Sequence, residues 1–153
     1  MSIHSEKAKE NFEKGYNCAQ SVLLAFSDVT GLDEKSALLL SSSFGGGMGR
    51  LREVCGALTG IFMAAGLIYG YTDTTDNEAK AAHYGRIQTL GLKFKEKYST
   101  FLCRDLLELD IIHDIPTPEP RTPEYYQKRK CSQYVEFAAM LLDEYMEDHG
   151  DGK

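Results

Sequence analysis

Apolar residues recur at intervals of three or four along almost the whole chain, which predicts helices rather than strands. No segment shows the convincing alternation of apolar and polar residues that a half-buried strand would require. Residues 5–14 predict a first, polar helix. Asn17 is a residue type that caps helices, so a second helix is expected over residues 18–27, with Cys18 on its apolar face.

The next part of the chain predicts a short helix and then a longer apolar one. After a turn at Gly31, Asp33 is placed to cap the short helix, which runs through residues 38–40. The longer helix is expected to begin near Leu51 and to end at Gly70. Its apolar stripe consists of Leu51, Cys55, Leu58, Phe62 and Ala65.

The second half of the chain predicts three further helices and a proline-rich connector. The sequence TDNE, beginning at Thr75, has the form of a capping box and opens a long helix that ends near Tyr98. A short helix carrying Cys103 follows. All four prolines lie in residues 113–124, which predicts an extended, fairly stiff connector. The last helix is expected over residues 123–148.

Length and composition fit one domain. With 153 residues, of which 42% are hydrophobic, residues 1–153 are expected to form a single all-α helical bundle of five to six helices. The net charge of −6 argues against a nucleic-acid partner, which normally meets a basic face. Residues 1–14 lack the apolar run of a signal peptide, and the uncharged residues 54–72 are too interrupted by glycines to span a bilayer. We therefore expect a cytoplasmic protein.

Four cysteines change the picture, because in a reducing compartment such residues more often serve redox, catalytic or metal chemistry than structural disulfides. Each lies near the start of a predicted helix and on its apolar face, where partial positive charge favours a thiolate. If the helix starts meet, the four sulfur atoms share one pocket. The alternative is that each cysteine packs as a small hydrophobic residue. The four are Cys18, Cys55, Cys103 and Cys131.

Their spacing excludes several kinds of site. No C-x-x-C pair is present, which argues against a thioredoxin-type pair and a zinc knuckle, and no C-x-x-C-H is present, which argues against covalent haem. A site made of all four cysteines has to be assembled by the tertiary fold. An iron–sulfur cluster held by four thiolates, or another thiolate-bound metal, is one such site.

The segment FGGGMGRLREVCGALTG surrounds Cys55 with residues that admit close approach and with two cations. It lacks the ending of a P-loop, so it is a weak nucleotide motif. Arg50 and Arg52 are candidates to stabilise a Cys55 thiolate or to bind an anionic substrate, the alternative being a solvated helix start. Gly56 and Gly60 make a flat groove for another backbone. The candidate anion- or substrate-binding residues are Gly45, Gly46, Gly47, Gly49, Arg50, Arg52, Gly56 and Gly60.

The histidines and tyrosines add no further site. His83 falls on an apolar stripe and is interpreted as a core residue, whereas His4, His113 and His149 are expected at the surface. No Ser/His/Asp arrangement can be inferred. The nine tyrosines are typical of core edges or of a dimer surface.

Four segments together resemble the C_GCAxxG_C_C family of redox-active proteins. They are GYNCAQSVLLAF, FGGGMGRLREVCGALTG, FLCRDLL and KRKCSQYV, and the similarity extends over residues 12–140. CGALTG fits the CGAxxG element, with Gly56, Ala57 and Gly60 as motif positions. The resemblance implies that the four cysteines are the functional set. A related domain occurs in some multihaem cytochromes, where an iron–sulfur centre has been suggested. Because the present chain lacks a haem-attachment signature, the resemblance implies at most an iron–sulfur cluster and no haem.

Three hypotheses follow. In the first, the cysteines cycle between dithiol and disulfide, as in an oxidoreductase, with Cys55 as nucleophile and with a small molecule or a redox protein as partner. In the second, four thiolates hold an iron–sulfur cluster or another metal for electron transfer. In the third, the protein is a non-catalytic helical bundle, as a monomer or a homodimer, whose cysteines only pack.

Overall fold

A computed structural model describes residues 2–150 and 152 of the chain, and it is helical throughout. The predicted all-α class is confirmed: within the described residues the only β-type pairing is an antiparallel bridge between Val54 and Leu102. The expectation of five to six helices is too low, because several segments of four to eight residues are separate helices. The elements are α1 (Ile3–Glu13), α2 (Cys18–Ala25), α3 (Ser27–Thr30), α4 (Glu34–Ser41), a 3₁₀ turn η1 (Ser42–Phe44), α5 (Gly45–Met48), α6 (Gly56–Tyr69), α7 (Asn77–Tyr98), α8 (Cys103–Leu106), α9 (Pro123–Lys128) and α10 (Cys131–His149).

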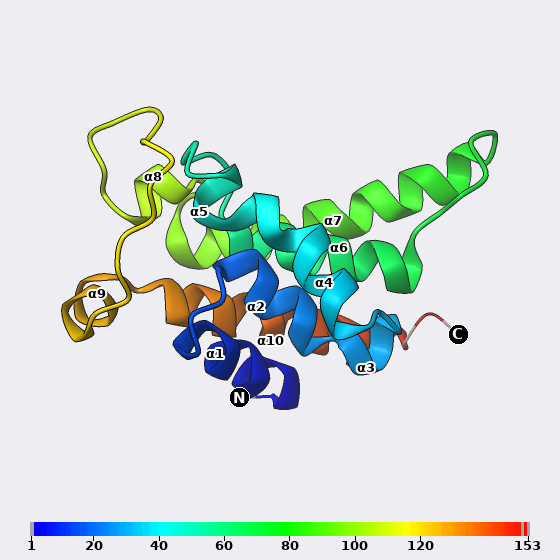
Figure 1. Cartoon of the computed structure of the whole chain (residues 1–153). Coiled ribbons are helices and arrows are strands. Elements are labelled where there is room, and N and C mark those ends of the chain that lie inside the picture. The colour runs from blue at the N-terminus through cyan, green and yellow to red at the C-terminus, as the bar shows by residue number, and fades with distance from the viewer. Residues whose placement is uncertain (1, 151, 153) are drawn as a thin grey trace.

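The core lies between α1, α2, α6 and α10, which pack against one another, while α7 reaches away from this group at one end (Figure 1). Because α2 lies directly on α6, a Cβ atom at Gly60 would sit 2.8 Å from Cβ of Val22. The predicted close approach at Gly56 and Gly60 is therefore confirmed, with α2 as the neighbour. The largest fully buried side chains are Phe12, Phe26, Phe94, Leu23, Leu58, Ile61, Leu90 and Leu142.

Local capping signals set several helix starts. The Asn17 side chain accepts a hydrogen bond from the amide of Gln20 at 2.9 Å, and Asp33 caps α4, both as predicted. The prediction of Thr75 as a cap is wrong by one residue, because Asp76 accepts the bond from the amide of Ala79 and α7 begins after it. An aspartate fills this role as well as a threonine does.

The start of α6 differs from the prediction. We expected this helix to begin near Leu51, but it begins at Gly56, and Leu51 is 46% exposed. The residues between them form no helix: Arg52 has a φ angle of +59°, and Val54 pairs with Leu102. The helical spacing of apolar residues extends back to Leu51, but no helix forms there because the residues just before it adopt left-handed backbone angles.

Residues 46–50 form a left-handed turn. Their φ angles are +67°, +70°, +69°, +61° and +67°, and the amide of Gly49 donates to the carbonyl of Gly45 at 2.9 Å. A Cβ atom makes this conformation costly, so only a glycine-rich sequence forms such a turn readily. Three of these five residues are glycine. The left-handed turn thus accounts for the glycine-rich sequence, and no nucleotide-binding site is needed to explain it.

Two further expectations are corrected near the chain ends. The single last helix is divided into α9 and α10, because Arg129 is extended (ψ +125°) and Lys130 lies outside both helices. His4 is buried rather than on the surface: its ring contacts Asp143 at 2.6 Å and Asp28 at 2.8 Å and stacks on Phe26. Two carboxylates thus satisfy both ring nitrogen atoms.

The proline-rich segment runs from α8 to α9 as an extended connector along one edge of the molecule (Figure 1). Most of its residues are exposed, but Arg121 is half-buried against the end of α1. None of the helices formed by residues 2–150 combines the length and apolar character needed to cross a membrane.

Candidate functional site

All four cysteines lie at helix starts and line one cavity. Cys18 and Cys131 are the first residues of α2 and α10, Cys103 is the first residue of α8, and Cys55 is the N-cap of α6. The cavity has a volume of about 200 Å³ and lies where these elements meet α5 and the connector. The prediction that distant cysteines share a pocket is confirmed by this arrangement. All four are free thiols.

The left-handed turn brings its backbone against the cysteines. A Cβ atom at Gly47 would sit 2.6 Å from Cβ of Cys103, and one at Gly45 would sit within 2.4 Å of the Asn17 side chain. Of the glycines predicted to bind an anion or substrate, Gly45, Gly46, Gly47 and Gly56 line the cavity. Gly49 and Gly60 do not line the cavity. Gly49 is the C-cap of α5, and Gly60 packs on α2.

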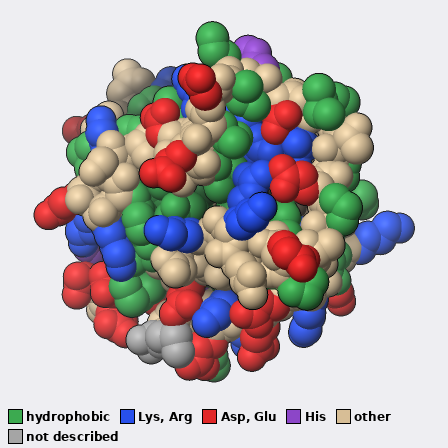
Figure 2. All heavy atoms as spheres, turned by 90° about the vertical axis from the view of Figure 1, so that its left-hand side faces the viewer, with side chains coloured by type: hydrophobic (Ala, Val, Ile, Leu, Met, Phe, Trp, Pro, Cys, Tyr) green, Lys and Arg blue, Asp and Glu red, His purple; other side chains and the backbone are tan. Residues whose placement is uncertain are grey.

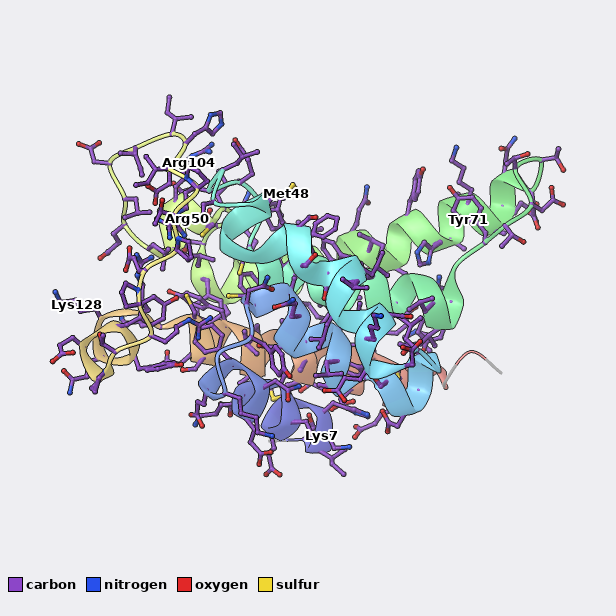
Figure 3. The ribbon with its side chains drawn as sticks, in the orientation of Figure 1. Lys7, Met48, Arg50, Tyr71, Arg104 and Lys128 are labelled. Atoms are coloured by element: carbon purple, nitrogen blue, oxygen red, sulfur yellow. The ribbon has the colours of Figure 1, made fainter. Side chains whose placement is uncertain are left out.

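Arg50 and Arg52 line the cavity, but they do not serve Cys55. Both guanidinium groups contact one carboxylate oxygen of Asp114 at 2.9 Å, and Nη1 of Arg52 donates to Sγ of Cys103 at 3.5 Å. The predicted support of a Cys55 thiolate by these cations is therefore wrong. The turn directs Arg52 toward α8, and the connector supplies the one acid that pairs with both arginines. In Figure 3, Arg50 lies between the turn and the connector.

Cys18 and Cys131 line the same cavity, and the interaction between their thiols shifts both pKa values. Hydrogen bonding from the Cys18 thiol lowers the pKa of Cys131 from the ordinary cysteine value, and the positive charges of Arg129 and Arg121 act in the same direction against the effect of burial. The same bond raises the pKa of Cys18 well above that value, and burial adds to the increase. Of the two thiols, Cys131 is therefore the more acidic, and Cys18 holds its proton more tightly.

The other two cysteines have raised pKa values. Burial raises the pKa of Cys55 to about 12, although the backbone amides of Ala57 and Leu58 at the start of α6 oppose the shift. Burial also raises the pKa of Cys103, against the hydrogen bond from Arg52. The helix start at Cys55 thus favours a thiolate as predicted, but the cost of burial is larger. Cys55 remains protonated.

Several cavity residues were not predicted from the sequence. Arg121 and Arg129 bring two more cations to the wall, and Tyr125 adds an aromatic face. Figure 2, which views the molecule from the side of α8 and α9, shows Lys and Arg side chains gathered across the middle of this face. Arg129 stands two residues before Cys131 and Arg52 three before Cys55, and an arginine shortly before a cysteine was the available signal. Arg121 had no such local signal.

The arrangement can be tested against the metal hypothesis. Within residues 2–150 and 152, no three histidine, cysteine, aspartate or glutamate side chains are grouped closely enough to hold one metal ion. The four thiols line a common wall but do not converge on one point. As placed, they do not fit a four-thiolate metal or iron–sulfur centre.

Comparison with known proteins agrees with the cysteine pattern. The family described as "Putative redox-active protein (C_GCAxxG_C_C)" matches residues 16–145, a span that includes all four cysteines and the left-handed turn. No curated protein and no solved structure matches the chain significantly.

Proposed function

The chain belongs to the C_GCAxxG_C_C family of redox-active proteins, and we propose that it performs thiol–disulfide exchange, with Cys131 as the nucleophile and Cys18 as the resolving thiol. One observation carries this assignment. Two cysteines from different helices line one cavity, and the cations of that cavity favour the thiolate on Cys131. The thiolate is the form that attacks a disulfide, so the lowered pKa makes Cys131 the favoured nucleophile.

The exchange proceeds in two steps. The Cys131 thiolate attacks one sulfur atom of a substrate disulfide, forming a mixed disulfide and releasing the other half as a thiolate, which takes up a proton. Cys18 then loses its proton and attacks the Cys131 sulfur, forming a Cys18–Cys131 disulfide and releasing the second half as a thiol. Two electrons pass from the protein to the substrate, and a dithiol reductant restores the starting state by the reverse exchange.

Cys18 is well suited to the second step because it contacts Cys131 before the reaction. As a residue it is partly exposed, whereas the other three cysteines are buried. We assign no exchange step to Cys55 and Cys103, since burial keeps both protonated at neutral pH. Arg52 holds the Cys103 thiol in the wall of the cavity.

Alkylation by iodoacetamide as a function of pH tests the nucleophile. We expect Cys131 to react with a midpoint below the ordinary cysteine pKa of 9.0, and Cys18→Ala to raise that midpoint by removing the hydrogen bond. Cys55→Ala is the matched control, because it removes a cavity thiol that does not donate to Cys131. Equal midpoints in the wild type and Cys18→Ala would contradict the assignment.

Mild oxidation tests the resolving thiol. Treatment with diamide should lower the free-thiol count from the four seen here by two, and peptide mapping should find a Cys18–Cys131 bridge. A count that stays at four, or a bridge that joins other cysteines, refutes the mechanism. Cys103→Ala should still form the Cys18–Cys131 bridge.

A further inference from the structure

The cavity carries more positive than negative charge, although the chain as a whole has a net charge of −6. Its cations are Arg50, Arg52, Arg121 and Arg129. Asp114 forms ion pairs with the first two, and Glu119 forms one with Arg129. Four guanidinium groups thus face two carboxylates. A thiolate on Cys131 balances one of the remaining charges and leaves one positive charge in the cavity wall.

Arg121 is the cation of this set that pairs with no carboxylate within the described residues. Its guanidinium donates to the carbonyl of Phe12 at 3.0 Å and to the carbonyl of Tyr16 at 2.9 Å, and it has no carboxylate partner within the described residues. The group stacks 4.2 Å from the centre of the Phe12 ring and 5.0 Å from that of Tyr125. Carbonyl dipoles and aromatic faces orient a cation but do not neutralise it.

A guanidinium group that is held in place without a carboxylate partner can bind an anionic ligand. Arg121 comes from the connector, yet its position is fixed by backbone groups at the end of α1, so little side-chain freedom is lost when an anion binds. It lines the same cavity as Cys131. A planar guanidinium suits a carboxylate in particular, because two parallel hydrogen bonds can form.

We propose, on the basis of the thiol–disulfide function above, that the substrate is a small organic disulfide bearing a carboxylate that pairs with Arg121 while its sulfur–sulfur bond lies at Cys131. The cavity of about 200 Å³ admits such a group. The substrate is itself the oxidant. Each turnover converts one disulfide and the protein dithiol into two carboxylate-bearing thiols and the Cys18–Cys131 disulfide, so electrons and protons balance.

Three disulfides that differ mainly in charge test this. The reduced full-length protein is mixed at neutral pH and low salt with 3,3′-dithiodipropionate, which is anionic, bis(2-hydroxyethyl) disulfide, which is neutral, and cystamine, which is cationic. Each rate is divided by the rate of the same disulfide with dithiothreitol, which removes differences in intrinsic reactivity. We expect the normalised rate of the anionic disulfide to exceed that of cystamine about tenfold or more, and salt to reduce the ratio.

Variants locate the recognition. Arg121→Gln should bring the anionic-to-cationic ratio close to one, and Arg121→Lys should retain part of it. A change in the thiolate population of Cys131 alters all three rates together, so the ratio reports recognition alone. Arg86→Gln is the matched control, because Arg86 also stacks on tyrosine rings but lies on α7 outside the cavity.

The outcomes separate the two proposals. If none of the three disulfides oxidises the protein, the exchange function fails, and the substrate class fails with it. If all three react with equal normalised rates, exchange stands and the anionic substrate is refuted. An unchanged ratio in Arg121→Gln also refutes the role of Arg121. Should that variant not fold, Arg121→Lys and the salt dependence of the wild type decide the question.

Discussion

Replacing Gly47 by alanine tests whether the left-handed turn exists to bring the backbone against Cys103. The added methyl group would lie 2.6 Å from Cβ of Cys103, 2.8 Å from the amide nitrogen of Glu53 and 2.9 Å from Cα of Arg52. Two of these atoms belong to the backbone, so no side-chain rotation can relieve the contacts. The turn itself must move, and with it the Arg52 guanidinium that donates to Cys103.

Two separate costs determine the size of the effect. The φ angle of +70° at Gly47 imposes about 1–2 kcal/mol on any residue with a Cβ atom. Overpacking against fixed neighbours adds about 1–3 kcal/mol. The sum, about 2–5 kcal/mol, is a large part of the roughly 5–15 kcal/mol that stabilises a typical domain.

Gly49→Ala is the matched control, because it imposes the first cost without the second. Its φ angle is +61°, and a Cβ atom there meets nothing closer than the Ser43 carbonyl oxygen at 3.8 Å. Urea unfolding followed by circular dichroism, in the presence of a reductant, gives both free energies. We expect Gly47→Ala to be less stable than Gly49→Ala by about 1–3 kcal/mol. Equal losses in the two variants would refute the argument from close approach.

Two further predictions concern α6, α7 and the buried histidine. The Cβ atom of Gly60→Ala would lie 2.8 Å from that of Val22, so this variant should lose about 1–3 kcal/mol of unfolding free energy in the same assay. Gly85→Ala lies on the open face of α7 and should gain about 0.5–1 kcal/mol of unfolding free energy. A loss of stability in Gly85→Ala would contradict this. The pKa of His4 is raised above 6.5, chiefly by its hydrogen bond to Asp143, so the folded state binds the proton more tightly than the unfolded state. The contribution of His4 to stability is therefore complete below pH 6.5 and is lost as the pH rises through the folded pKa. The difference in unfolding free energy between wild type and His4→Gln should accordingly be largest in acid. A difference independent of pH would exclude this linkage.

Those parts of the fold that depend on local signals could be predicted from the sequence. Asn17 and Asp33 cap their helices with side chains that reach only three residues ahead, so the pattern of neighbours is sufficient. The clustering of the cysteines followed from a similar regularity. Each was expected on the apolar face of a helix start, and such faces turn toward the shared core.

Features that depend on distant partners could not be predicted. Arg50 and Arg52 end on Asp114, more than sixty residues away, and no local pattern announces that acid. Arg121 is oriented by carbonyl groups of α1 and of the loop that follows it, which are still more remote in sequence. The raised pKa of Cys55 could not be predicted either, for a physical reason. The helix start at Cys55 does favour a thiolate, but burial, which the sequence does not quantify, outweighs it.

The wide separation of Cys18 and Cys131 along the chain has a consequence for biosynthesis. The ribosome delivers α2 before α10, and most of the other helices are made between the two. Until then a nascent chain displays a thiol without its partner, with the acidity of any free cysteine. The lowered pKa of Cys131 therefore arises only once α2 and α10 have met, and under the proposed function selective labelling of that sulfur would serve as a reporter of maturation.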